Sequence, residues 1–148
     1  MEWSTHALSG VVTGYVATGG DWKGAIVGGI AGVIPDLDEP KSKFGKLFLP
    51  ISLPLNKIFG HRTFTHSLLF TFLLTGILFP FTDPWVWLAT FVGVIAHIIG
   101  DMATGKVKFL YPLDKSIGFR IHPIHFKPID RITRALLIVC LFIIVVNI

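Results

Sequence analysis

The sequence predicts an all-α fold, a polytopic membrane helix bundle of about five apolar segments: two helical hairpins plus a C-terminal span. Composition is the first observation, because 52% of the 148 residues are hydrophobic, only 15% are charged, and the mean hydropathy is +0.70. A soluble domain of this size is rarely so apolar. The second observation is that the apolar residues form runs, and the third is that the basic residues gather in the loops between them. We expect one integral membrane domain over residues 1–148.

Three apolar runs have the length and composition of spans, Ser67 to Phe81, Trp85 to Ile99 and Ile132 to Ile148. The first is short for a hydrocarbon core about 30 Å thick. Asp83 and Pro84 separate the first two runs, and we expect Asp83 to cap the second helix and Pro84 to occupy its first position. The first two runs therefore predict a helical hairpin.

Two weaker runs lie upstream, at residues 7–20 and 24–34, and each carries glycines four residues apart. They are Gly10 and Gly14 in the first run, and Gly24, Gly28 and Gly32 in the second. Small residues at this spacing allow helices to approach closely in lipid. The pattern predicts a second, tightly packed hairpin; the alternative is that both runs are short and only half-inserted.

The distribution of charge predicts the topology. Of the 13 Lys and Arg residues only Lys23 lies on one side, and the other 12 lie in residues 35–66, in residues 101–131 and at the start of the last run. The positive-inside rule places that basic side in the cytoplasm. Trp22, Trp85 and Trp87 lie at the opposite turns, as an outer aromatic belt requires. Topology therefore accounts for the net charge of +4, and we expect no nucleic-acid partner and no cleaved signal peptide.

Histidines and acids lie at the ends of the apolar runs, and the hairpins bring them to one membrane face. His97 lies inside an apolar segment, where an ionisable side chain is costly without a partner. The convergence of the others on His97 predicts a site there. The candidates are His6, Asp36, Asp38, His61, His66, His97 and Asp101.

The residue types in this set predict a metal ion. His97 and Asp101 are four apart and project from one helix face, which suits two ligands of one ion. Asp36 and Asp38 follow Pro35 and offer acceptor oxygens from a loop. Imidazole and carboxylate without thiolate suit Zn²⁺ best, with Mn²⁺ or Fe²⁺ as alternatives. The predicted metal ligands are His6, Asp36, Asp38, His66, His97 and Asp101.

Each piece of this pattern also has a simpler reading. A single HxxxD pair on a helix is common, and an acidic loop after a proline is usually a solvated turn. His122 and His125 are expected to be interfacial residues rather than ligands. The single cysteine, Cys140, excludes a disulfide framework and a CxxC metal site.

The motifs "IPDLDEPKS", "FGHRTFTHSLL" and "HIIGDMATGKVKFLYP", in this order and spacing, resemble the YdjM-like family of inner-membrane proteins described as metal-dependent hydrolases. The resemblance covers roughly His6 to Pro112, and nothing is carried over from Leu113 onward. It implies an inner-membrane location and an active-site set of Asp36, Asp38, His61, Arg62, His66, His97 and Asp101, with His6 a further member. More distantly, the spaced His and Asp pattern is similar to the zinc-dependent phospholipase C and nuclease group, which act on phosphodiesters.

These residues predict roles in a metal-dependent hydrolase. His66, beside Thr65 as the expected helix cap, would be a ligand, and His61 a ligand or a proton shuttle. Arg62 would reach outward to a phosphate, and Asp36 or Asp38 would orient an attacking water. The expected substrate is a phosphorylated lipid or phosphoester at the cytoplasmic membrane face, attracted by a basic rim of Lys41, Lys43 and Lys46.

Two other classes of function stay open. A structural membrane protein would use the same cluster for a non-catalytic metal and would bind a partner through "FLPISLPLNKIF", residues 48–59. A transporter would need its ligands near the bilayer midplane, whereas these residues are predicted near the membrane edge. The pattern does not determine the oligomeric state.

Overall fold

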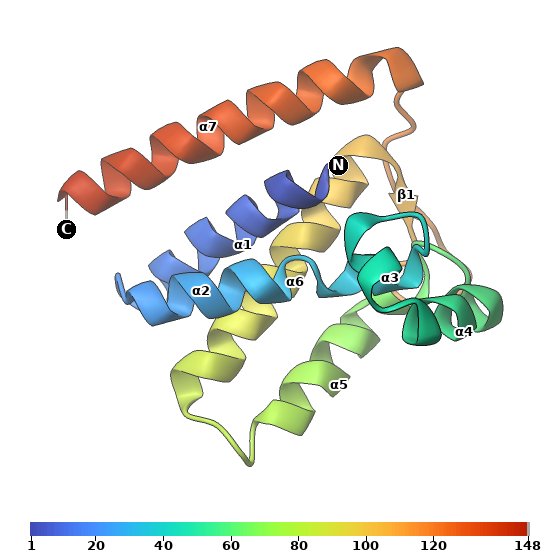
Figure 1. Ribbon diagram of the computed structural model, residues 1–148, viewed down its shortest axis with the longest axis horizontal. Coiled ribbons are helices and arrows are strands. Elements are labelled where there is room, and N and C mark those ends of the chain that lie inside the picture. The colour runs from blue at the N-terminus through green and yellow to red at the C-terminus, as the bar shows by residue number, and fades with distance from the viewer. Residues whose placement is uncertain (148) are drawn as a thin grey trace.

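A computed structural model describes residues 1–147, and the chain is mostly helical, as predicted (Figure 1). One small antiparallel ribbon was not anticipated, in which β1 (Lys106–Val107) pairs with β2 (Ile117–Gly118). The α-helices of the described residues are α1 (Trp3–Ala17), α2 (Trp22–Ala31), α3 (Lys43–Leu47), α4 (Leu49–Phe59), α5 (Leu68–Leu78), α6 (Pro84–Thr104) and α7 (Phe126–Asn147).

Helices α1, α2 and α6 pack tightly through glycine, which confirms the close hairpin contact predicted for the first two runs. A Cβ on Gly10 would collide with the backbone of Gly28, and one on Gly14 would collide with the backbone of Gly24. Gly93 of α6, which the sequence analysis did not single out, abuts the same Gly28 carbonyl. Because no side chains separate these backbones, the three helices hold their ends in fixed register.

Only α6 among the described helices is both long and apolar enough to cross a membrane, with 21 residues. Helix α5 is apolar but has 11 residues, a length of about 16 Å at 1.5 Å per residue. Helices α1 and α2 have 15 and 10 residues, and the first third of α7 is charged. The structure therefore does not show five membrane-length helices; Ile148, the end of the last predicted span, lies outside the described residues.

Many large apolar side chains lie on the surface of this protein, and many polar side chains are buried. The buried apolar cluster is small, formed by Ala31, Val94, Ile98 and Val107. Large apolar side chains are instead exposed along α5 and α7, while fifteen polar or charged residues are buried. A monomeric soluble protein rarely exposes so much contiguous apolar surface, whereas lipid would cover it. This inversion agrees with a bilayer environment.

Two expected helix caps differ from those observed. Pro84 occupies the first turn of α6 as predicted, but the Asp83 side chain at the N-cap position makes no capping hydrogen bond. At α5 the capping side chain is Ser67, which accepts from the amide of Phe70. Thr65 was expected to cap this helix, but its hydroxyl donates to Asp38 instead. Ser67 lies at the N-cap position of α5, so the Thr65 hydroxyl is free of capping and bonds to Asp38.

Candidate metal centre

All eight candidate residues meet at one end of the bundle. The start of α1 carries His6, and the short 3₁₀ turn after α2, Ile34–Asp38, carries both aspartates. The segment before α5 carries His61, Arg62 and His66, and the last turns of α6 carry the remaining two. Below, "the cluster" means His6, Asp36, Asp38, His61, Arg62, His66, His97 and Asp101.

His66 and His97 face each other at the centre of the cluster, with their Nε2 atoms 3.1 Å apart. His97 Nδ1 lies 2.7 Å from the carbonyl of Gly32, so it carries the proton and donates. His66 Nδ1 lies 3.0 Å from Thr65 Oγ1 and 3.3 Å from Asp38 Oδ2, and it donates on that side. Neutral rings would therefore point two nitrogen lone pairs at each other. Either a proton or a metal cation must lie between them.

His6 and Asp101 complete the deeper side of the cluster. The His6 ring stacks on that of His97 with centroids 3.7 Å apart. Its Nε2 lies 3.2 Å from Asp101 Oδ1, yet the contact lacks hydrogen-bond geometry, and this buried nitrogen has no hydrogen-bond partner among the described residues. Asp101 Oδ2 lies 3.3 Å from His66 Nε2. A buried donor or acceptor without a hydrogen bond is costly, and coordination of a metal would relieve that cost.

Asp38 receives more hydrogen bonds than any other acid of the cluster. Its oxygens accept from the Arg62 amide at 3.1 Å and from the Thr65 hydroxyl, and they lie 2.7 Å from His61 Nδ1. It thus contacts the Nδ1 side of both His61 and His66. A carboxylate in this place fixes the orientation of the rings and leaves each Nε2 to bind a ligand.

Arg62 turns inward, whereas the sequence analysis expected it to reach outward. Its Nε donates to Asp101 Oδ2 at 2.9 Å, and its side chain is 26% exposed. Its backbone has φ +62°, a conformation that costs energy for a non-glycine residue. The carbonyl of Arg62 accepts from the Lys108 amide at 3.0 Å, which holds this conformation. Gly105 leaves room for the guanidinium, because a Cβ there would collide with Nη1.

One side of the cluster is open. A pocket of about 210 Å³ borders it, lined by residues that include Asp36, His61, Arg62 and Lys43. His61 is 31% exposed at its side chain, whereas His66 and His97 are fully buried. A small ligand can therefore reach the cluster from the Arg62 side.

Burial and charge shift the ionisation of the residues outside α6. Burial raises the pKa of Asp36. Burial would also raise the pKa of Asp38, but hydrogen bonds from His61 and His66 outweigh it and hold that pKa below its usual range. For His66 burial opposes protonation, yet the carboxylates of Asp101 and Asp38 raise its pKa to about 9. Without a metal the proton between the two rings therefore stays on His66, and a metal would have to displace it.

Three overlapping groups of side chains could hold a metal ion, each with its ligand atoms within 4.8 Å of one another. The first and third groups share no residue, so two ions could be held at once. The unbonded Nε2 of His6 and the facing nitrogens of His66 and His97 fit a cation. The groups are His6, His97 and Asp101; Asp36, His66 and His97; and Asp38, His61 and His66.

The remaining candidates lie away from the cluster or contribute through the backbone. His122 and His125 pair with each other and are exposed, and Cys140 is exposed on α7. The sequence analysis missed the Gly32 carbonyl, because a backbone acceptor carries no residue signature. It also assigned Thr65 to a helix cap; its position between two site histidines was the available signal.

Comparisons with known proteins identify the family of this chain. The family model described as "YdjM inner membrane protein" matches residues 1–148. The chain belongs to the YdjM family. It is 37% identical over 102 residues to the inner membrane protein YdjM of Escherichia coli (strain K12), covering 63% of this chain and 52% of that protein. It is also 37% identical over 92 residues to YvsG of Bacillus subtilis (strain 168), covering 60% and 56%.

The chain therefore spans about half the length of the curated relatives it matches. No solved structure matches it. The predicted family resemblance and the expected membrane location are confirmed.

Proposed function

We propose that this YdjM-family protein is a metal-dependent hydrolase of the inner membrane that acts on a phosphorylated lipid or other phosphoester. The observation that carries the proposal is the His66–His97 pair, whose Nε2 atoms lie 3.1 Å apart. The opposite nitrogen of each ring has its own partner. Such a pair is arranged to bind a cation, and the unbonded Nε2 of His6 adds a third nitrogen beside it.

Nitrogen and carboxylate ligands without thiolate favour zinc, with Mn²⁺ or Fe²⁺ as alternatives. His6, His66, His97, Asp101 and Asp36 would hold it. The metal would supply Lewis acidity and a water of lowered pKa. Asp38, which binds the Nδ1 side of His61 and His66, is the residue that orients the ligands, although it too belongs to one of the metal-holding groups.

The open side of the cluster supports catalysis over a purely structural ion. A structural metal is closed by protein ligands, whereas a catalytic one keeps a position for water. Here Arg62 and His61 are partly exposed beside the ligands. Arg62 would contact the phosphoryl group through its Nη atoms, while Nε stays on Asp101. His61 would hand a proton to the leaving oxygen.

The proposed topology is multi-pass with the cluster at the cytoplasmic face. Support comes from the basic residues, of which Lys23 alone lies on the opposite side, and from the shared direction of the helix ends. The test is cysteine labelling in a Cys140→Ser background. A cysteine at Asp83 should react with an impermeant reagent from outside, and one at Lys43 should not; the reverse pattern would overturn the assignment.

The activity test is a screen of the metal-loaded protein against phosphatidic acid, isoprenoid phosphates and soluble phosphodiesters. The proposal expects turnover that disappears on chelation and returns with the metal. Stoichiometric tight metal without turnover of any of these compounds would favour the structural alternative, a membrane protein that binds a partner through α4.

A further inference from the structure

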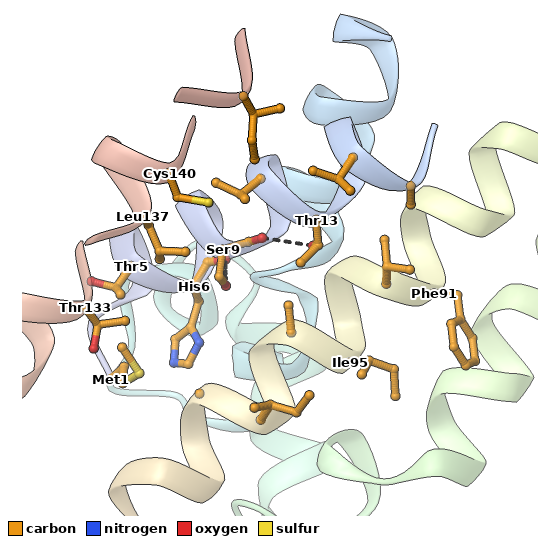
Figure 2. Close-up of a pocket in the computed structure, with 18 residues that line it drawn as sticks. Met1, Thr5, His6, Ser9, Thr13, Phe91, Ile95, Thr133, Leu137 and Cys140 are labelled. Carbon is orange, nitrogen blue, oxygen red and sulfur yellow. Dashed lines mark hydrogen bonds between the residues drawn. The ribbon is translucent and has the colours of Figure 1, made fainter. Parts of the chain in front are cut away.

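A long apolar groove lies between α1, α6 and α7 and begins next to the cluster (Figure 2). Its volume is about 670 Å³. One end is formed by Met1, His6 and Gly100, and the groove continues along the helices past Phe91 and Ile144. His6 is thus both a cluster residue and part of the groove wall.

The wall of the groove is apolar even where hydroxyl residues line it. Ser9 donates its hydroxyl hydrogen to the His6 carbonyl at 2.8 Å, and Thr13 donates to the Ser9 carbonyl at 2.9 Å. Figure 2 shows these bonds turned along α1. Thr5 accepts from Arg134 at 3.1 Å. Because these groups are already bonded within the protein, the groove favours an occupant without polar groups, a hydrocarbon chain.

The opposite side of Met1 is polar and carries charged side chains of both signs. The pocket of about 210 Å³ that contains Arg62 and Lys43 includes Met1, and so does a second pocket with Arg62 and Lys127. An apolar groove and two polar pockets that contain Arg62 therefore meet at Met1. A molecule that fills both has a polar head and a long hydrocarbon tail, and the guanidinium of Arg62 would select a phosphate as that head.

We propose that the groove binds the hydrocarbon chain of a lipid whose phosphate headgroup lies at Arg62. The headgroup position rests on the proposed function, whereas the chain position rests on the groove alone. Helix α7 forms one wall through Thr133, Leu137, Cys140 and Ile144, which recur at helical spacing. Its start is tied to the beginning of α1 by Arg134, which pairs with Glu2 and donates to Thr5, and by Asp130, which accepts from the Glu2 amide. Substrate choice would then depend on the chain as well as on the phosphate.

The test uses the full chain in phosphatidylcholine vesicles that contain phosphatidic acid with a photoreactive diazirine in its acyl chain. After illumination, mass spectrometry should find labels on groove residues of α6 and α7. Leu137→Trp should lower the labelling severalfold by filling the groove. Leu136→Trp is the matched control, because Leu136 is 64% exposed and does not line the groove; it should label like the wild type.

Equal labelling of the two variants would overturn the proposal, provided both retain wild-type metal content as a check of folding. Labelling by a diazirine phosphatidylcholine as strong as that by phosphatidic acid would also overturn it, since the groove would then hold bulk lipid. Selective labelling without hydrolysis of any phosphoester would preserve the groove and refute the hydrolase. Hydrolysis of a soluble phosphoester together with an unlabelled groove would support the hydrolase and refute lipid binding in the groove.

Discussion

Two pairs of neighbouring histidines in this protein have similar ring spacing but differ in burial and in the partners of their nitrogens. His66 and His97 have ring centroids 5.0 Å apart, and His122 and His125 have centroids 6.4 Å apart. The first pair is fully buried, and both of its Nδ1 atoms have partners. The second pair is exposed, and a nitrogen of His122 accepts from the amide of Ile124.

The comparison shows that nearby histidines alone do not predict a metal centre. In the buried pair, Gly32 and Thr65 occupy the Nδ1 atoms, so the Nε2 atoms face inward with Asp101 beside them. In the exposed pair no carboxylate lies beside either ring among the described residues. Fixed orientation and a shared acid separate ligands from surface residues.

Removing one ring of the buried pair should have the largest effect. His97→Ala deletes a ligand shared by two of the three groups, so metal content should fall by at least half, since only the group of Asp38, His61 and His66 stays intact. His122→Ala combined with His125→Ala is the matched control and should keep the wild-type content. Elemental analysis of the purified proteins decides; equal metal content in all three would remove the basis for a centre at His97.

Arg62 separates metal binding from chemistry. Arg62→Lys keeps a positive charge beside Asp101 and should retain the metal, but it loses the planar fork that fits a phosphate. Turnover should fall by about 100-fold, the order expected for the loss of one charge stabiliser. Arg62→Ala should also weaken metal binding, because Asp101 Oδ2 loses its donor and only the Met1 ammonium bond to Oδ1 remains. Unchanged turnover in both variants would exclude Arg62 from the reaction.

The orienting role of Asp38 predicts a smaller effect on metal affinity. Asp38→Asn keeps the shape but weakens the hydrogen bonds to His61 and His66, and the dissociation constant should rise by about 10-fold to 100-fold. The control is Asp114→Asn, at an exposed acid paired with Lys108, which should leave the constant unchanged. Competition titration with a chelating dye measures both. A complete loss of metal would instead make Asp38 a ligand.

Helix packing below the cluster should also matter, by a modest amount. Gly28→Leu would push α1 away from α2 and should destabilise the fold by about 1–3 kcal/mol, the usual cost of overpacking. Gly76→Leu is the control, since a Cβ there meets nothing within 4 Å. Thermal unfolding in detergent compares them; equal stability would mean that the close glycine contact between α1 and α2 does not stabilise the fold.

The structure brings together the residues that the sequence grouped into one candidate site, whereas it does not show five membrane-length helices. His97 in an apolar run and Asp101 one turn later indicated a site, because a buried ionisable group needs partners. The first predicted span, Ser67 to Phe81, is longer than the helix observed there. Apolar composition continues past Leu78, where α5 ends, so hydropathy overestimated that helix.

Details that depend on three-dimensional contact could not be read from the chain. The inward turn of Arg62 depends on the empty space at Gly105, more than forty residues later. The contact of Gly93 with Gly28 joins α6 to α2. It could not be predicted, because α6 lacks the four-residue glycine spacing of the first two apolar runs. By contrast, the Gly10 and Gly28 contact followed from local spacing alone, which is why it was predicted.

His66 and His97 are proposed to hold a metal through nitrogen. X-ray absorption at the metal edge of the purified, metal-loaded protein tests this proposal most directly. For zinc we expect a first shell of nitrogen and oxygen at about 2.0–2.2 Å without sulfur, a clear contribution from imidazole rings, and loss of at least half of the bound metal in His97→Ala. A shell that contains sulfur, which only Cys140 or a methionine could supply, or a metal that survives His97→Ala unchanged, would contradict the account.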